Sequence, residues 1–274
     1  MNLNGKVALV TGAAGGLGRA IALAYGQAGA RVVSSDINEA GLAGTAALLK
    51  EAGAECISSV CDVSSSAAVD RMFAATCERF GTVHILVNNA GVIPVRPEDE
   101  ARRKRHYAYI TTPEPRRSLQ LTSSISDEDW LRFWNVNVHG VFYATRAALR
   151  LMEPQRYGKI INVASIAGIS AMSAHSPHYS ATKGAVVAFT KAVALDVAGA
   201  NIFVNCIAPG GVHTPDFERY LASLSEQDRN RMWQFVPLGR LGTPEEYAAL
   251  AVYLASDQHY LVGQIISPNG GAVI

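Results

Sequence analysis

Short apolar runs alternate with longer stretches of helical periodicity along most of the chain. The runs expected to form strands are residues 6–10, 30–34, 55–60, 85–88, 160–164, 204–208 and 264–267. The stretches expected to form helices are residues 17–27, 39–51, 66–79, 127–152, 179–197 and 244–255. Strands that alternate with helices form parallel βαβ units, and helices cover both faces of the resulting sheet. The pattern predicts a three-layer α/β fold with a doubly wound parallel sheet.

The chain has 274 residues, which is ordinary for one α/β sheet with its covering helices. Without an internal repeat or a linker, residues 1–274 are expected to form a single domain. Residues 93–126 depart from the pattern, because they show no clear period and contain Pro94, Pro97, Pro113 and Pro115. The same segment is basic, with Arg96, Arg102, Arg103, Lys104, Arg105, Arg116 and Arg117. A structureless segment of this length is usually functional or mobile.

Composition and charge exclude several classes of protein. The formal net charge of +1 argues against binding to nucleic acid or to a membrane surface, since both need a strong basic field. No apolar run reaches the roughly 18 residues of a membrane span, and the N-terminus lacks a signal-peptide pattern. The cysteines form no CxxC pair that would indicate a zinc site or a redox dithiol: Cys56, Cys61, Cys77 and Cys206. We expect a cytoplasmic protein with reduced cysteines and no bound metal.

A glycine-rich turn, Thr11-Gly12-Ala13-Ala14-Gly15-Gly16-Leu17-Gly18, connects the first predicted strand to the first predicted helix. Glycines permit a tight turn, and they let backbone N–H groups approach a pyrophosphate at the positive end of the helix. The turn therefore predicts a Rossmann-like dinucleotide site, with cofactor contacts at Gly12, Gly16, Leu17 and Gly18.

Asp36 ends the second predicted strand. An acid at this place accepts hydrogen bonds from the adenine ribose hydroxyls and repels a 2′-phosphate. No Arg or Lys occupies the glycine turn or the positions just after Asp36, which favours NAD over NADP.

The third and fourth predicted strands end in small and polar residues. In sheets of this kind, ligands bind at the carboxyl ends of the strands. Further cofactor contacts are therefore expected at Asp62, Val63, Asn89, Ala90 and Gly91.

Tyr179 and Lys183 lie one helical turn apart on the same predicted helix face. A tyrosine near pKa 10 is a poor base at neutral pH, and a nearby ammonium favours its phenolate. Ser165 follows the fifth strand and is placed to hydrogen-bond a substrate oxygen. Asn137, on the preceding long helix, is placed to hold a water between Lys183 and solvent.

The chain resembles the short-chain dehydrogenase/reductase family in its compact single-domain branch, from Gly5 to Gly271. The matching motifs occur in order: Thr11-Gly12-xxx-Gly16-x-Gly18, Asn88-Asn89-Ala90-Gly91, Asn137, Ser165, Tyr179-xxx-Lys183 and Pro209-Gly210.

The resemblance implies a role for each catalytic residue. Tyr179 would be the general acid/base and would also contact the cofactor, and Lys183 would lower its pKa and bind the nicotinamide ribose. Ser165 would steady the reacting oxygen, and Asn137 would support a proton relay. The cofactor contacts implied after the sixth strand are Pro209, Gly210, Val212 and Thr214. The resemblance also implies a homotetramer that pairs helices 127–152 and 179–197, with a second contact through residues 263–274.

Two departures from the family pattern concern the substrate side. The spacing from Ser165 to Tyr179 is one residue longer than usual, in a loop that contains Ser170, Ser173, His175, Ser176 and His178. Residues 93–126 are an apparent insertion near the active-site mouth, and we expect a flap that helps to set substrate choice. Its arginines are placed to attract an acidic substrate, although charges in a loop are more often merely solvated.

The sequence thus predicts an NAD-dependent oxidoreductase that interconverts a secondary alcohol and a ketone. The alternatives are a non-catalytic NAD-binding sensor or scaffold on the same fold, and an epimerase or dehydratase with bound NAD. The family resemblance implies that residues 217–236 cover the substrate. Their apolar side chains are spaced as one helical face, which core packing explains first and an apolar substrate pocket second: Phe217, Tyr220, Leu221, Leu224, Met232, Trp233 and Phe235. Cyclic alcohols, sterol-like alcohols and 3-hydroxyacyl thioesters all remain open as substrates.

Overall fold

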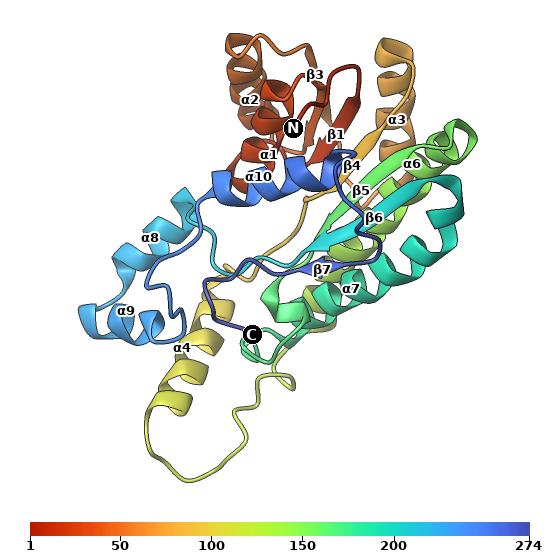
Figure 1. Cartoon of the computed structure of the whole chain (residues 1–274). Helices are drawn as coiled ribbons and strands as arrows, with labels where there is room; N and C mark the ends of the chain where they lie inside the picture. The colour runs from red at the N-terminus through yellow and green to blue at the C-terminus, as the bar shows by residue number, and fades with distance from the viewer.

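Seven parallel strands form one sheet in the computed structural model, in the order β3-β2-β1-β4-β5-β6-β7 (Figure 1). The structure describes residues 1–274, apart from the side chains of residues 215–216, 223, 228 and 231–232. The strands are β1 (Val7–Thr11), β2 (Arg31–Asp36), β3 (Cys56–Val60), β4 (Ile85–Asn88), β5 (Gly158–Val163), β6 (Ile202–Ile207) and β7 (Ile265–Ile266). The strand order reverses between β1 and β4, and ligands bind at such a switch point.

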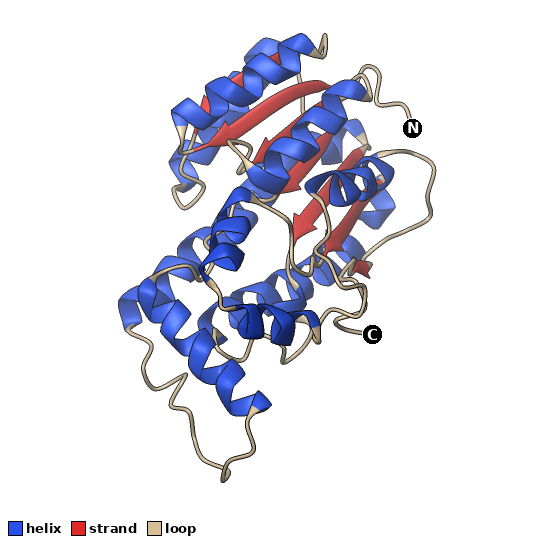
Figure 2. Ribbon diagram, turned by 90° about the vertical axis from the view of Figure 1, so that its left-hand side faces the viewer, coloured by secondary structure: helices blue, strands red, loops and turns tan.

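Helices cover both faces of the sheet (Figure 2). Against one face lie α1 (Gly16–Gln27), α2 (Glu39–Glu51) and α10 (Pro244–Ala255). Against the other lie α3 (Ser66–Phe80), α6 (Val141–Gln155) and α7 (Pro177–Val197). Alternate residues of β1 point into the two cores, Ala8 and Val10 into one and Val7 and Leu9 into the other. The predicted three-layer, single-domain α/β fold is confirmed.

The stretch expected to be one helix over residues 127–152 is interrupted. It consists of α5 (Asp127–Trp134), a π-helical turn (Asn135–Gly140) and then α6. At Gly140 the backbone lies so close to Val63 that an added Cβ would stand 2.8 Å from its side chain. The π-helical turn contains Asn137, and such turns are frequent at functional sites. Short 3₁₀ turns also cover Ile166–Gly168 and Ala198–Ala200.

The prediction that residues 93–126 lack structure is wrong over α4 (Pro97–Thr111). Pro97 starts the helix, and the Asp99 carboxylate accepts a hydrogen bond from the Arg96 backbone N–H at 3.1 Å. The buried residues of α4 are Asp99, Arg102 and His106, which are polar. A helix whose buried face is polar shows no apolar periodicity, so the sequence does not predict α4. In Figure 1, α4 and the loop after it project below the sheet.

Residues 217–236 also differ from their prediction. They belong to α8 (Pro215–Ser223) and α9 (Glu226–Trp233), and the chain is extended at Leu224 between them. The expected single apolar face is therefore divided between two helices. The Met232 side chain, which the prediction included, lies outside the described residues. Within the described part of the chain, no helix has the length and apolar character needed to cross a membrane.

Candidate active site

A groove of about 570 Å³ runs along the carboxyl ends of β1 to β4. We call it the dinucleotide groove. The predicted cofactor contacts that line it are Gly12, Gly16, Leu17, Asp36, Asp62, Val63, Asn89, Ala90, Gly91 and Thr214. The prediction missed Gly15, Ile37, Cys61, Val92, Ile93 and Val136, which also line it. These are mostly apolar side chains whose position becomes clear only when neighbouring strands are assembled.

The glycine turn opens the groove at the start of α1. Gly12 and Gly18 pack so closely that a Cβ on Gly18 would collide with the Gly12 carbonyl oxygen. In contrast, a Cβ on Gly15 would meet nothing within 4 Å. Helix α1 begins at Gly16 with no side-chain cap and no acid in its first turn. Its first N–H groups are thus available to an anion, which fits the phosphates of a dinucleotide.

Asp36 lies at one end of the groove with its carboxylate held by the backbone. It accepts hydrogen bonds from the Ala14 N–H at 3.1 Å and the Asn38 N–H at 3.0 Å. No Lys or Arg is among the described residues that line the groove. The nearby Arg19 guanidinium is engaged by the carbonyls of Ala14 and Gly41.

The four predicted catalytic residues gather at the other end of the groove. The Lys183 ammonium nitrogen lies 5.8 Å from the centre of the Tyr179 ring and donates a hydrogen bond to the Val163 carbonyl at 2.8 Å. It also lies close to the groove, since a Cβ added to Gly91 would be 3.6 Å from it. Tyr179 and Ser165 line a second hollow. The Tyr179–Lys183 pair therefore stands between the two hollows.

Asn137 is fully buried beneath this pair and holds the chain just after Gly91. Its side-chain oxygen accepts a hydrogen bond from the Val92 N–H at 2.7 Å, and its amide donates to the Val92 carbonyl at 3.0 Å. The same amide donates to the Thr182 hydroxyl at 3.2 Å. Asn137 thus ties the groove to the helix that carries Tyr179 and Lys183.

Burial changes the protonation of both members of the pair. The pKa of Tyr179 is raised, because burial disfavours the phenolate more strongly than a hydrogen bond with Ser165 favours it. Burial lowers the pKa of Lys183 to about 8. The direction for Tyr179 is opposite to the expected one, since its ring is desolvated and the Lys183 ammonium is directed at the Val163 carbonyl. Tyr179 is consequently a protonated acid at neutral pH.

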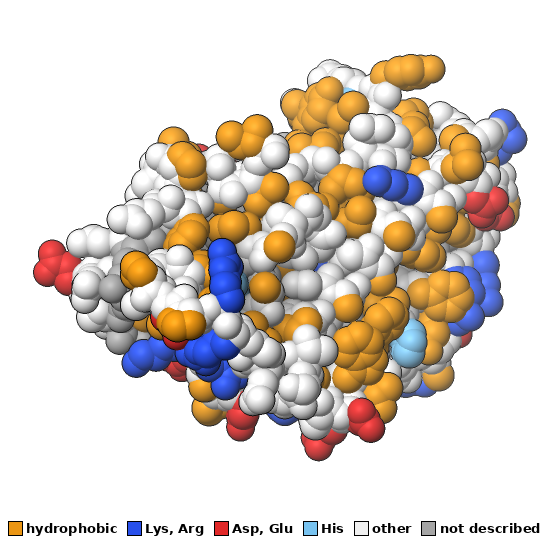
Figure 3. Space-filling model, turned by 90° about the horizontal axis from the view of Figure 1, so that it is seen from below, with side chains coloured by type: hydrophobic (Ala, Val, Ile, Leu, Met, Phe, Trp, Pro, Cys, Tyr) orange, Lys and Arg blue, Asp and Glu red, His pale blue; other side chains and the backbone are white. Residues whose placement is uncertain are grey.

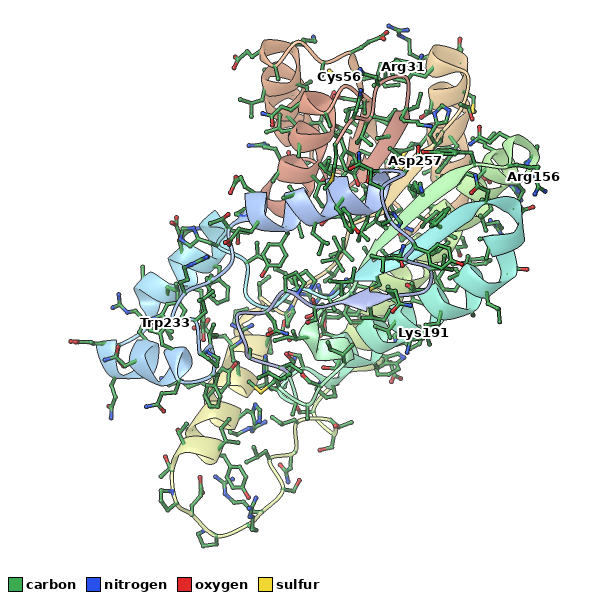
Figure 4. The ribbon with its side chains drawn as sticks, viewed as in Figure 1. Arg31, Cys56, Arg156, Lys191, Trp233 and Asp257 are labelled. Carbon is green, nitrogen blue, oxygen red and sulfur yellow. The ribbon has the colours of Figure 1, made fainter. Side chains whose placement is uncertain are left out.

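The second hollow, which we call the substrate pocket, has a volume of about 210 Å³. Its walls come from segments far apart in the chain: Pro94, Arg103 and Tyr107; Met172, Ser173 and His175; and Phe217, Tyr220 and Phe235. The Tyr107 and Phe235 rings stack with centres 5.8 Å apart, so α4 contacts the chain just after α9. Figure 4 shows the side chains of these elements and labels Trp233 at the end of α9.

Several predicted residues lie elsewhere. Gly210 lines the substrate pocket rather than the groove. Gly18, Pro209 and Val212 line neither; Gly18 packs inside the glycine turn, and Val212 forms a parallel bridge with Gly242. Arg103 and Tyr107 were not predicted as site residues, and no local motif distinguishes them from their neighbours in the basic segment. The interpretation that the arginines of residues 93–126 are solvated is wrong for Arg102, which is only 6% exposed.

A doubly wound sheet with a dinucleotide groove and an adjacent Tyr–Lys pair defines a nicotinamide-dependent oxidoreductase. A family model described as short chain dehydrogenase matches residues 6–223. The 3-oxoacyl-[acyl-carrier-protein] reductase FabG of Thermotoga maritima is 36% identical over 278 residues, which cover 100% of both chains. The chain therefore belongs to the short-chain dehydrogenase/reductase family.

Two further proteins are similar over nearly the whole chain. The (2S)-[(R)-hydroxy(phenyl)methyl]succinyl-CoA dehydrogenase subunit BbsD of Thauera aromatica is 34% identical over 272 residues, covering 99% of this chain and 98% of that protein. The crystal structure of levodione reductase superposes with a TM-score of 0.82 at 30% identity, over 98% of this chain and 97% of that one.

Proposed function

We propose that the protein is an NAD-dependent dehydrogenase/reductase that interconverts a secondary alcohol and a ketone. The observation that carries this proposal is the position of Tyr179. Its ring lines the substrate pocket beside Ser165, and the Lys183 ammonium nitrogen lies 5.8 Å behind it, next to the dinucleotide groove.

The residues of the pocket account for the proton chemistry of ketone reduction. The carbonyl carbon would accept a hydride, which a nicotinamide held in the dinucleotide groove would supply. Tyr179, protonated at neutral pH, donates its proton to the carbonyl oxygen, so that the C=O π bond is replaced by new C–H and O–H bonds. The Ser165 hydroxyl donates a hydrogen bond to the same oxygen. Lys183, charged below about pH 8, would stabilise the phenolate that forms when Tyr179 gives up its proton. Asn137 positions the helix that carries both residues through its hydrogen bonds to Thr182 and Val92.

The choice of NAD rests on Asp36. Its carboxylate is fixed at the end of the groove by two backbone N–H groups, and no cation among the described lining residues is available for a 2′-phosphate. The negative charge of this carboxylate would repel a 2′-phosphate, whereas the carboxylate would accept hydrogen bonds from ribose hydroxyls.

The substrate is proposed to be a small molecule with a ketone or secondary alcohol. Three relatives are named as two reductases and one dehydrogenase, and their names contain oxo, hydroxy and dione groups. The pocket of about 210 Å³ would hold the reacting end of such a molecule against the aromatic rings of Tyr107, Phe217 and Phe235.

A homotetramer is proposed from exposed apolar side chains on the helices for which the family resemblance implies pairing. Trp130 and Leu131 on α5, Phe142 on α6 and Leu195 on α7 are exposed, and Leu195 is 84% exposed. Ile274, in the second proposed contact, is also exposed. Light scattering at micromolar concentration should give a tetramer, and a stable monomer would refute it. The free thiols of Cys56, Cys61, Cys77 and Cys206 support a reducing, cytoplasmic setting.

The function is tested by measuring turnover of a panel of cyclic, aryl and acyl ketones with NADH and with NADPH. We expect reduction of at least one ketone, a higher kcat/KM with NADH, and loss of turnover in Tyr179→Phe. Binding of NADH without turnover of any ketone or secondary alcohol would favour the non-catalytic sensor instead.

A further inference from the structure

Arg103 brings a positive charge into the substrate pocket from the second turn of α4. It lines the pocket together with Tyr179 and Ser165, and its side chain is half-buried. Its Nη2 atom donates to the Pro94 carbonyl at 2.6 Å, and its Nε atom lies 3.5 Å from Nε2 of His175. The guanidinium lies 4.9 Å from the centre of the Tyr220 ring. Arg103 is therefore held in one place by the walls of the pocket.

The charge of Arg103 is not neutralised by the described side chains around it. It is the only charged residue among the described residues that line the pocket. Asp99, the buried acid of α4, is already paired with Arg102 at 2.6 Å and lies 3.6 Å from His178. Burial and the charge of Arg103 lower the pKa of His175 to about 3, so that this ring is neutral at neutral pH.

A guanidinium carries five N–H donors in a planar fork, and the contacts of Arg103 use only two of its three nitrogens. A half-buried cation with free donors is best compensated by an anion with matching planar geometry, which a carboxylate provides. The other walls of the pocket are largely aromatic, formed by Tyr107, Phe217, Tyr220 and Phe235. We propose that the substrate is a keto acid or hydroxy acid, and that Arg103 binds its carboxylate while Tyr179 faces its carbonyl. This inference rests on the function proposed above.

The anchoring of α4 fits this role. Asp99 and Arg102 are buried against the start of α7, where His178 precedes Tyr179. The helix that supplies Arg103 is thus fixed to the helix that supplies Tyr179, which sets the distance between carboxylate and carbonyl. Figure 3 views the end of the molecule from which α4 projects, and Lys and Arg side chains gather on that face.

The test compares benzoylpropionate and benzoylbutyrate with their carboxamides, which have the same shape and no charge. With NADH, wild-type kcat/KM should favour the acids by about tenfold or more, the scale of a charge-assisted hydrogen bond. Arg103→Gln should reduce the ratio of acid to amide to about one, mainly through KM of the acid. Arg103→Lys should keep part of the ratio. The matched control is Arg105→Gln, an exposed arginine on the same helix, and it should leave the ratio unchanged.

Equal use of acid and amide by the wild type, or an unchanged ratio in Arg103→Gln, would overturn the inference while the proposed function stands. Absence of turnover for every ketone would instead count against the proposed function. If Arg103→Gln fails to fold, the inference is tested by calorimetric titration of folded Tyr179→Phe, in complex with NADH, with benzoylpropionate and with its amide. Tighter binding of benzoylpropionate than of its amide supports the inference, and equal or undetectable binding of both overturns it.

Discussion

The dinucleotide groove and the substrate pocket meet at Tyr179 and Lys183, yet they are built in different ways. The groove is made at the carboxyl ends of β1 to β4, largely from glycines, small residues and backbone groups. The pocket is made from side chains of α4, of residues 172–175 and of residues 217–236, which lie outside the sheet. Arg156 and Asp257, labelled in Figure 4, mark the opposite, amino-terminal end of the strands.

This difference separates what the fold fixes from what the individual chain adds. Backbone groups at a strand end are positioned by the sheet itself, so the groove follows from the fold. Side chains on attached helices and loops can change without disturbing the sheet, and substrate choice therefore resides there. Substitutions in the two regions should accordingly separate cofactor use from substrate use.

The largest effect is expected where the two regions meet. Tyr179→Phe removes the acid that protonates the carbonyl oxygen and should lower kcat by at least about a hundredfold. Because Tyr179 does not line the dinucleotide groove, the affinity of the variant for NADH should remain nearly unchanged. Steady-state kinetics and calorimetric titration with NADH measure the two quantities. A variant with wild-type turnover would remove Tyr179 from the mechanism.

The next effect concerns the stability of α4. Asp99→Asn leaves Arg102 as an unpaired cation that is 6% exposed, and breaking a buried ion pair of this kind costs about 3 kcal/mol. Urea unfolding and hydrogen exchange of α4 measure the loss. The matched control is Glu114→Gln, which breaks the exposed pair with Arg117 and should cost less than about 1 kcal/mol. A similar loss in both variants would show that the buried pair does not anchor α4.

The stabilising effect of Asp99 should also depend on pH in a defined direction. The hydrogen bonds from the Arg102 guanidinium and the Arg96 backbone N–H, with His178 nearby, outweigh burial and hold the pKa of Asp99 at about 2, below an unfolded value of about 3.9. A lowered folded pKa stabilises the protein fully above the unfolded pKa, and this contribution is lost as the pH falls through the folded pKa. The stability difference between wild type and Asp99→Asn should thus shrink below about pH 4.

A smaller effect is expected in the groove itself. Asp36→Arg replaces the acceptor for ribose hydroxyls with a cation that suits a 2′-phosphate, and should shift the NADH/NADPH ratio of kcat/KM by about tenfold or more toward NADPH. The preference for acid over amide should not change, since Asp36 does not line the substrate pocket. A wild-type kcat/KM with NADPH that equals or exceeds the value with NADH would contradict the assignment of NAD.

The smallest effect is the pH dependence of reduction. Lys183 has a lowered pKa of about 8, so its stabilising charge is present below that pH and is lost above it. The kcat/KM for ketone reduction should therefore be level near neutral pH and fall by at most about tenfold per pH unit above pH 8. A profile that rises through this range would contradict the role of Lys183 in supporting proton donation.

The two regions also differ in how far the sequence predicts them. The glycine turn, Asp36 and the Tyr179–Lys183 spacing are local patterns, and the structure places each at the expected strand end or helix face. Helix α4 was not predicted because its buried residues, Asp99, Arg102 and His106, are polar and give no apolar periodicity. Arg103 lies within a run of similar basic residues, and only the folded contacts with Pro94 and His175 distinguish it. Long-range contacts between side chains leave no local periodicity.

Transfer of hydride from NADH to a ketone, with Tyr179 as the acid, is tested most directly by isotope labelling. NADH with deuterium at the transferred position is incubated with the enzyme and a ketone of the panel, and the product is analysed by mass spectrometry. We expect an alcohol with one deuterium on the carbinol carbon, and about a hundredfold slower labelling with Tyr179→Phe. An alcohol without deuterium, or equal labelling in both proteins, would contradict it.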